Sequence, residues 1–277
     1  MKTQSYRHVF RGPVLACVFD WAGTTIDYGC RAPAAVFREA FAAFGVEITE
    51  TEARAPMGLP KKDHIRMIGA MPTVAARWQA GLGRPFDESD VEAVYRRFLP
   101  RQIEVAGSYA DVIPGVAEAV ARLRERGIRI GSTTGYTRDI MAACVDRARA
   151  QGYDPEVVMC SGDGRRGRPA PDLLWRAMME LAVSPPAAVV KIGDTVADIE
   201  EGLNAGTWTV GCALTGNEMG LSLADVESLP LAERTVRRDR AAAKLVGAGA
   251  HFVINEVADL PPAIDAINRL LEDGERP

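Results

Sequence analysis

Paired cysteine motifs, long apolar runs and an excess of basic charge are all missing from this chain of 277 residues. Its five cysteines are an odd number and contain no CxxC pair: Cys17, Cys30, Cys144, Cys160 and Cys212. This pattern argues against a disulfide framework and against a zinc site. Because three of the cysteines lie in apolar, strand-like runs, we expect most of them to be buried thiols in a reducing cytoplasm.

The apolar segments are short. None reaches the roughly 18 residues needed to cross a bilayer. Near the N-terminus, the apolar run from Val14 to Phe19 leads directly into Asp20, whereas a secretory signal has a longer apolar region that ends at a small-residue cleavage site. We therefore expect neither a membrane span nor a secretory leader.

Charge is nearly balanced, with 33 Lys and Arg residues against 37 Asp and Glu residues and a net charge of −4. This balance argues against a protein that coats nucleic acid, although a local basic pocket stays open. Hydrophobic residues make up 47% and charged residues 25% of the chain, which is typical of a soluble globular protein. The length fits one large domain or two modest ones.

Short β-branched runs alternate with helical patterns along most of the chain. The runs span residues 14–19, 128–133, 157–160, 189–192, 209–213 and 252–254. Helices are expected between them, with start or stop signals at Pro114, Gly127, Thr137, Pro171 and Gly206. Strands that alternate with helices predict a parallel sheet covered on both faces.

Residues 30–107 interrupt this alternation, because they contain no convincing strand. Helices are expected over 34–44, 60–71, around Trp78 and over 90–106. We therefore predict an α/β protein with a Rossmann-like parallel-sheet core, formed by residues 1–29 and 108–277, and an inserted helical cap domain, residues 30–107. An arginine-rich stretch over 234–240 is interpreted as a solvated helix face, with an anion site as the alternative.

Polar residues follow the predicted strands where a parallel sheet binds its ligands, at the carboxyl ends. Asp20 follows the first strand, Thr134 and Gly135 the second, Arg168 comes after the third, and Asp194 ends the fourth. A dianionic phosphoryl group needs such a set. Carboxylates hold Mg²⁺, hydroxyl and backbone N–H groups hold the phosphoryl oxygens, and arginine balances the charge.

This order of motifs resembles the haloacid dehalogenase superfamily of phosphoryl-transfer enzymes over essentially the whole chain. The resemblance implies that Asp20 is the nucleophile. The usual superfamily motif is Asp-x-Asp, whose second Asp protonates the leaving oxygen, but Ala22 stands at that position. Since general acid catalysis typically contributes 10²–10⁴-fold, the protein is either inactive or expels a group other than an alkoxide. Arg168 replaces the lysine of many members and keeps the charge.

A segment of the predicted cap offers a second reactive group. Counted at helical spacing, Lys61 shares a stripe with Met57, His64 and Ile65, whereas Lys62 points to solvent. Burial against apolar surface favours a neutral lysine amine, which can attack an aldehyde to form an imine. On the stripe alone, a surface Lys61 that extends its amine to solvent is the favoured interpretation, and the imine-forming amine is the alternative.

Five motifs together resemble the phosphonoacetaldehyde hydrolase family of this superfamily: residues 20–25, 57–64, 131–138, 167–169 and 193–198. The resemblance implies cleavage of the C–P bond of phosphonoacetaldehyde to acetaldehyde and phosphate, in the degradation of 2-aminoethylphosphonate. It implies that Lys61 forms the Schiff base, that Asp20 becomes phosphorylated, and that Mg²⁺ is bound by Asp20, the Ala22 carbonyl and Asp194. It also implies a homodimer formed through the cap.

The other candidate roles are less sharply defined. Thr134 and Arg168 would stabilise the phosphoryl oxygens, and Met57, Gly135 and Arg168 would bind substrate. His64 would shuttle protons during imine formation or is a helix-surface or interface histidine. Tyr136 would orient that network or pack beneath the cap. Cys30 is expected to be a buried structural thiol, with contact to the site as the alternative.

Two other functions compete with this interpretation. A sugar-phosphate phosphatase or mutase of the same fold would act on a small phosphate monoester, and Ala22 argues against it. A non-catalytic phosphate-binding module would not require Asp20, Lys61 and Asp194, yet all three are present.

Overall fold

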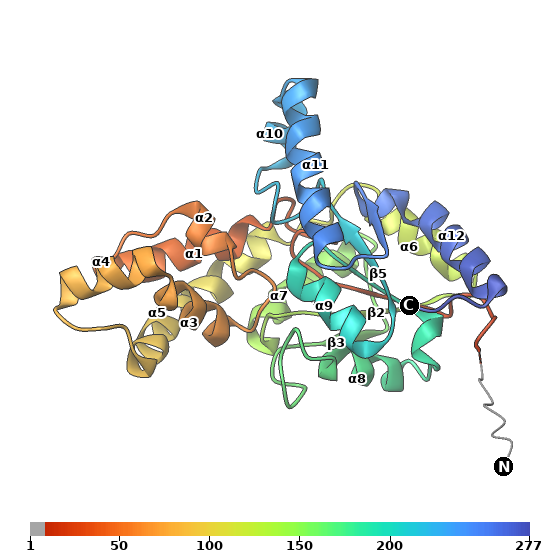
Figure 1. Cartoon of the computed structure of the whole chain (residues 1–277), viewed down its shortest axis with the longest axis horizontal. Coiled ribbons are helices and arrows are strands. Elements are labelled where there is room, and N and C mark those ends of the chain that lie inside the picture. Colours follow the sequence, from red (N-terminus) through yellow and green to blue (C-terminus); the bar gives the residue numbers. More distant parts are fainter. Residues whose placement is uncertain (1–8) are drawn as a thin grey trace, which may run out of the picture.

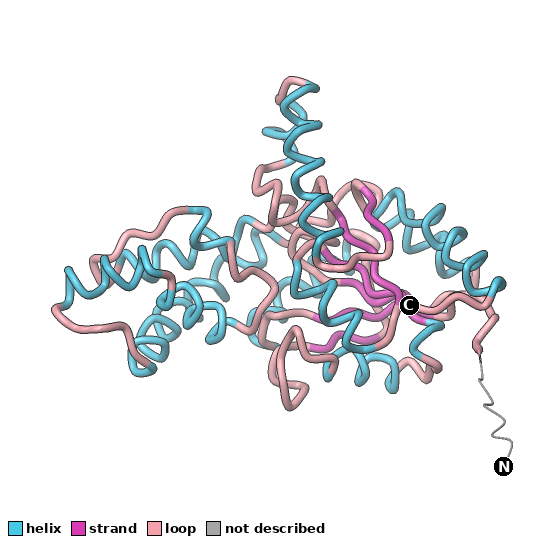
Figure 2. Tube along the Cα trace, in the orientation of Figure 1, coloured by secondary structure: helices cyan, strands magenta, loops and turns pink. Residues whose placement is uncertain are grey.

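A six-stranded parallel sheet forms the centre of the computed structural model, which describes residues 9–277. The strand order is β3-β2-β1-β4-β5-β6, and every neighbouring pair is parallel. Figure 2 shows the strands gathered between helices. The bounds are β1 Ala16–Phe19, β2 Arg129–Thr133, β3 Val157–Met159, β4 Val189–Gly193, β5 Trp208–Cys212 and β6 Phe252–Ile254. The predicted parallel-sheet α/β fold and its six strands are confirmed, while residues 1–8 of the predicted core segment lie outside the described residues.

Helices cover both faces of the sheet, as the alternation predicts (Figure 1). Their bounds are α6 Val116–Glu125, α7 Arg138–Ala150, α8 Asp172–Glu180, α9 Val196–Ala205, α10 Leu223–Ser228, α11 Leu231–Gly247 and α12 Leu260–Asp273. Short 3₁₀ turns span Gly107–Tyr109, Pro186–Ala188 and Val257–Asp259. Thr137 is the N-cap residue of α7 as expected, but the prediction that its side chain caps the helix is wrong, because it makes no capping hydrogen bond.

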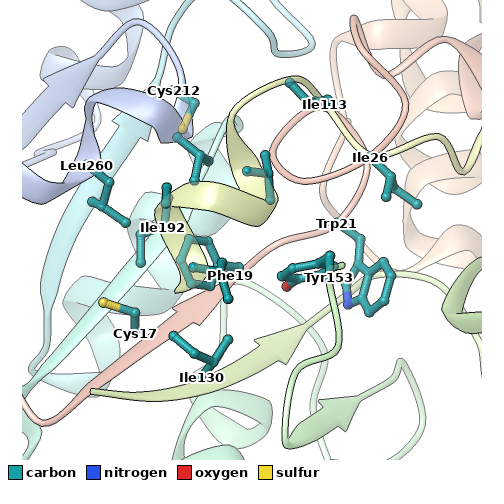
Figure 3. Packing of buried hydrophobic residues seen from close by; sticks show 14 of the residues in the cluster. Cys17, Phe19, Trp21, Ile26, Ile113, Ile130, Tyr153, Ile192, Cys212 and Leu260 are labelled. Carbon is teal, nitrogen blue, oxygen red and sulfur yellow. The ribbon is translucent and has the colours of Figure 1, made fainter. Parts of the chain in front are cut away.

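Alternate residues of β1 pack against the helices on the two opposite faces of the sheet. Cys17 and Phe19 pack with Ile130, Ile192 and Leu260 in one cluster (Figure 3). Ala16 and Val18 belong to a separate cluster with α8. All four residues of β1 are fully buried, which is typical of a central strand in a doubly covered parallel sheet. All five cysteines are free and buried, as expected.

Of the helices between β1 and β2, the five that precede α6 lie to one side of the sheet (Figure 1). They are α1 Arg31–Ala42, α2 Glu50–Arg54, α3 Lys61–Ala70, α4 Pro72–Leu82 and α5 Glu88–Ala106. Their apolar faces form a cluster of their own, which includes Phe37, Phe41, Ile65, Trp78 and Phe98. Within residues 9–277, no strand occurs between β1 and β2. The same part of the chain contains no helix that is both long and apolar enough for a membrane span.

The helix α2 is absent from the sequence expectations. Its signal is a capping box, in which Thr49 accepts from the Glu52 backbone while the Glu52 side chain accepts from the Thr49 backbone. The helix has only five residues, too few to produce an apolar stripe.

Candidate active site

The carboxyl ends of three adjacent strands bring the predicted catalytic residues to one edge of the sheet. Asp20 directly follows β1, and its backbone N–H donates to the Ile192 carbonyl of β4 at 2.8 Å. The chain then turns sharply at Gly23, whose φ of +92° favours glycine. A Cβ at Gly23 would lie 2.4 Å from Oδ2 of Asp194. Glycine therefore lets this turn approach the carboxylate that ends β4.

The segment before α3 packs directly on these strand ends. Gly58 has a φ of +91°, and a Cβ there would lie 2.3 Å from Oγ1 of Thr195. A Cβ at Gly135, after β2, would lie 2.9 Å from the Leu59 carbonyl oxygen. Glycine on both sides allows the two backbones to approach closely, which positions the start of α3 over the sheet edge.

A small cavity of about 20 Å³ lies between this segment and the strand ends. Eight of the ten predicted site residues line it: Asp20, Ala22, Met57, Lys61, Thr134, Gly135, Tyr136 and Arg168. His64 and Asp194 are not among its lining residues. Cys30 is buried and also lines the cavity, so both interpretations of this residue apply.

Lys61 and Lys62 meet opposite environments. Lys61 is only 4% exposed, with Nζ 4.8 Å from the ring centre of Tyr136 and 5.5 Å from that of Phe37. Burial lowers the pKa of Lys61 to about 8, although the nearby Cys30 and Asp20 oppose this shift. Lys62 instead pairs with Glu92 at 2.5 Å, and its side chain is 44% exposed. Of the two amines, only that of Lys61 borders the cavity.

Three buried carboxylates gather beside the cavity. One oxygen each of Asp20, Asp194 and Asp198 lies within 4.8 Å of the others. Burial raises the pKa of Asp20 to about 6, and Asp198 adds to the shift while Arg168 and Lys191 oppose it. Burial also raises the pKa of Asp194 well above its usual value. The cluster thus concentrates negative charge where a cation would relieve it.

Arg168 holds the nucleophile candidate in place. Its Nη1 donates to Oδ1 of Asp20 at 2.6 Å and forms an ion pair with Asp198 at 2.8 Å. Its Nη2 donates to the carbonyl and hydroxyl oxygens of Thr133, and Nε lies 2.9 Å from Oε2 of Glu201. The guanidinium is almost completely buried and has charged or polar partners on every side.

Comparisons with known proteins show which family the chain belongs to. A family model of haloacid dehalogenase-like hydrolases matches residues 14–206. The phosphonoacetaldehyde hydrolase of Paraburkholderia xenovorans (strain LB400) is 49% identical over 264 residues, which cover 95% of this chain and 99% of that protein. The chain belongs to the phosphonoacetaldehyde hydrolase family.

Two further proteins are similar to this chain over their full lengths. A phosphonoacetaldehyde hydrolase-like protein from Syntrophobacter fumaroxidans (strain DSM 10017 / MPOB) is 47% identical, with 100% of each chain covered. The crystal structure of a phosphonoacetaldehyde hydrolase-like protein from Oleispira antarctica superposes with a TM-score of 0.97 at 40% identity, again over 100% of both chains. The haloacid dehalogenase-like fold predicted from the motifs is confirmed.

Thr134 and Tyr136, which follow β2, are joined by a hydrogen bond. The backbone N–H of Tyr136 donates to Oγ1 of Thr134 at 3.1 Å. The Tyr136 hydroxyl lies 3.4 Å from Nε2 of Gln102 on α5, and burial raises the pKa of Tyr136 well above its usual value. Tyr136 therefore stays protonated. It contacts Gln102 on α5 through its hydroxyl, and its ring lies beneath the amine of Lys61 on α3.

His64 is buried behind the cavity rather than on its wall. Its ring stacks on Phe37 at 3.8 Å, and Nε2 lies 2.8 Å from the carbonyl oxygen of Ala53. Because a carbonyl oxygen can only accept, Nε2 carries the proton. Nδ1 has no hydrogen-bond partner among the residues that the structure describes. Burial, followed by the nearby Lys61, lowers the pKa of His64 well below its usual value, so the ring is neutral.

Sequence reasoning missed two charged residues beneath the site. Lys191 in β4 and Glu201 in α9 are fully buried, and both contact the network around Arg168. One signal for Lys191 was present, because a lysine in the centre of the apolar run 189–193 requires a buried counter-charge. Glu201 follows Asp198 by three residues, which places both carboxylates on one face of α9.

Proposed function

We propose that the protein hydrolyses the C–P bond of phosphonoacetaldehyde to acetaldehyde and phosphate. The observation that carries this proposal is that Lys61, with its lowered pKa, shares one cavity with Asp20, while Ala22 supplies no general acid. An amine beside a nucleophilic carboxylate suits a substrate that has both an aldehyde and a phosphoryl group. The name of the relative from Paraburkholderia xenovorans supports the same substrate.

In the proposed first step, the neutral amine of Lys61 attacks the aldehyde carbon. Loss of water from the resulting carbinolamine gives a protonated imine, which withdraws electrons more strongly than the aldehyde. His64 lies one helical turn from Lys61 and is neutral, with a bare Nδ1. We propose that Nδ1 accepts and returns a proton during this condensation.

In the second step, a carboxylate oxygen of Asp20 attacks phosphorus. The electron pair of the C–P bond moves into the carbon framework and neutralises the imine nitrogen, so that an enamine and an aspartyl phosphate form. Arg168 and the hydroxyl of Thr134 would stabilise the phosphoryl oxygens, with Gly135 and Met57 contacting the substrate. Since carbon leaves as an enamine, no acid is required at position 22, and Ala22 leaves room for the Lys61 side chain.

In the last step, water cleaves the P–O bond of the aspartyl phosphate and releases phosphate and the free carboxylate of Asp20. The enamine takes up a proton at carbon, and hydrolysis of the resulting imine releases acetaldehyde and regenerates Lys61. Tyr136, whose ring lies beneath Nζ, would orient the amine through these changes.

The carboxylate cluster fits a divalent cation. Four buried carboxylates face this region (Asp20, Asp194, Asp198 and Glu201), and they outnumber Arg168 and Lys191 even when a protonated Lys61 is included. We propose that Asp20, the Ala22 carbonyl and Asp194 hold Mg²⁺, which prefers such oxygen ligands. When bound, the ion supplies positive charge that lets an anionic phosphoryl group approach Asp20.

Three further features complete the proposal. Residues 30–107 would act as a cap domain over the core formed by 1–29 and 108–277, consistent with the separate apolar cluster of α1 to α5. The family resemblance favours a homodimer formed through this cap. The free cysteines favour a reducing, cytoplasmic location.

The decisive experiment supplies phosphonoacetaldehyde and follows acetaldehyde and phosphate together. Borohydride added with the substrate is expected to inactivate the enzyme irreversibly and to leave the adduct on Lys61 by peptide mapping. Lys61→Arg keeps the charge but cannot form the imine, so turnover is expected to fall by at least about 10³-fold. Lys62→Arg is the matched control and is expected to retain wild-type turnover.

Each alternative gives a different result. Release of phosphate from monoesters without any imine adduct would indicate a phosphatase or mutase. Phosphate binding without turnover of any substrate would indicate a non-catalytic module. An adduct on Lys62, or an active Lys61→Arg variant, would contradict the assignment of the reactive amine.

A further inference from the structure

A layer of buried charge lies directly beneath the proposed site. Lys191 is fully buried in β4, and its Nζ forms ion pairs with Asp198 at 2.8 Å and Glu201 at 3.3 Å. The same Nζ donates to Oγ1 of Thr133 at 3.1 Å. Neither Lys191 nor Glu201 lines the cavity. Neither residue can therefore touch the substrate, so their contacts reach the reaction through a neighbour, while the charge of Lys191 also acts on Asp20 across a distance.

That neighbour is Arg168, and Glu201 contacts it in two ways. Oε2 of Glu201 pairs with Nε of Arg168 at 2.9 Å. It also accepts from the hydroxyl of Thr133 at 2.9 Å, and that hydroxyl in turn accepts from Nη2 of Arg168 at 2.6 Å. These contacts fix one edge of the planar guanidinium, so that Nη1, on the opposite side, reaches Asp20 at 2.6 Å.

Lys191 supplies the charge that this arrangement needs. Without it, Arg168 would be the single buried cation facing both Asp198 and Glu201, because the other partner recorded for Asp198 is the neutral Thr195. A buried carboxylate without a counter-charge is costly. Arg168 would then be drawn toward α9 and away from Asp20. With Lys191 present, the two carboxylates of α9 are compensated and Arg168 stays at the sheet edge.

We propose that Lys191 and Glu201 are positioning residues that hold Arg168 against Asp20 and the phosphoryl group. This inference rests on the proposed function for the phosphoryl chemistry and goes beyond it in naming residues outside the cavity. It concerns the phosphoryl half of the reaction alone. Imine formation takes place at Lys61, which comes from α3, and we expect it to require neither residue once the substrate is bound.

Glu201 provides the sharpest test, because two explanations predict opposite signs. If Glu201 contributed charge alone, Glu201→Leu would remove a negative charge and strengthen the binding of inorganic phosphate. If Glu201 positions Arg168, the same variant is expected to weaken phosphate binding about 10-fold and to lower kcat by 10-fold or more. Glu201→Gln keeps an oxygen that accepts from Thr133, and it is expected to recover most of the loss.

The remaining readouts separate positioning from instability. At saturating phosphonoacetaldehyde, the rate of borohydride trapping on Lys61 in Glu201→Leu and in Lys191→Met is expected to stay within about twofold of wild type while kcat falls. Asp90→Asn is the matched control, since Asp90 is buried and pairs with Arg84 far from the sheet edge. This control is expected to lower the unfolding temperature while kcat stays unchanged.

Three results would overturn the inference: tighter phosphate binding by Glu201→Leu, unchanged kcat in both variants, or parallel loss of trapping, turnover and folded protein. If wild-type protein itself forms no adduct and does not turn over phosphonoacetaldehyde, the proposed function fails. Phosphate binding by the wild-type protein and Glu201→Leu still decides the role of Glu201 in that case.

Discussion

At the scale of single residues, neighbouring lysines differ in chemistry because they differ in burial. The Lys61 amine lies among Phe37, Tyr136 and the cavity, whereas Lys62 is neutralised by Glu92 at the surface. Water stabilises a charged ammonium, so its removal favours the neutral amine. One position along a helix thus separates a nucleophile candidate from a surface salt bridge.

The lowered pKa of Lys61 makes imine formation pH-dependent near neutrality. A lysine is nucleophilic when deprotonated, so the rate of trapping by cyanoborohydride with phosphonoacetaldehyde is expected to rise with pH, with a midpoint at about 8, and then to level off. Mass spectrometry of the adduct at fixed short times measures this profile. Lys62→Arg is expected to give the same curve. A rate that still climbs between pH 9 and 11 would show an ordinary lysine and contradict the burial argument.

At the scale of elements, glycine contacts bring the loop before α3 against the sheet. A Cβ at Gly58 would meet Thr195, and a Cβ at Gly167 would lie 2.1 Å from Cγ of Pro60. Arg54 of α2 adds hydrogen bonds to the carbonyl oxygens of Gly29 at 2.9 Å and of Gly220 at 3.0 Å. The start of α3, and therefore Lys61, is held in place by its neighbours on both sides of the cavity.

Gly58→Ala is expected to disturb this contact. The new Cβ would be strained at a φ of +91° and would collide with Thr195, so we expect kcat/KM and the rate of imine trapping to fall at least about 10-fold. Gly83→Ala is the matched control, because Gly83 also has a positive φ, of +74°, but has open space around it. It is expected to cost about 1 kcal/mol in stability and to leave turnover unchanged. Equal loss of activity in the two variants would indicate backbone strain without any role for the contact.

The elements differ in how far the sequence predicts them. The six strands and most of the long helices follow from apolar periodicity with caps and breakers, and α9 ends at Gly206 as expected. The helix α12, which follows the last strand, was not predicted. The helix α2 was not predicted, because five residues are too few to form an apolar stripe. Site residues in motifs after strands were accessible to sequence reasoning. The roles of Lys191 and Glu201 were not, because they depend on contacts between segments far apart in the chain.

At the scale of the whole molecule, the sheet edge collects more buried negative charge than its own cations balance. Asp20 and Asp198 contact Arg168, whereas Asp194 accepts from Thr24 at 3.0 Å and from the Asn217 backbone at 2.7 Å. Asp194 is therefore hydrogen-bonded, but it makes no ion pair with any described residue. Such an excess opposes folding unless protons or a cation offset it.

Mg²⁺ is accordingly expected to stabilise the folded protein as well as to support turnover. A ligand at 100 times its dissociation constant adds about 2.7 kcal/mol, which corresponds to a rise of several degrees in the unfolding temperature at this chain length. Differential scanning calorimetry with EDTA and then excess Mg²⁺ measures the shift, and phosphate release measures recovery. Asp194→Asn is expected to abolish both effects, while Asp90→Asn keeps them. If EDTA-treated protein unfolds at the same temperature with and without Mg²⁺ and hydrolyses phosphonoacetaldehyde at full rate, these carboxylates serve some purpose other than holding the ion.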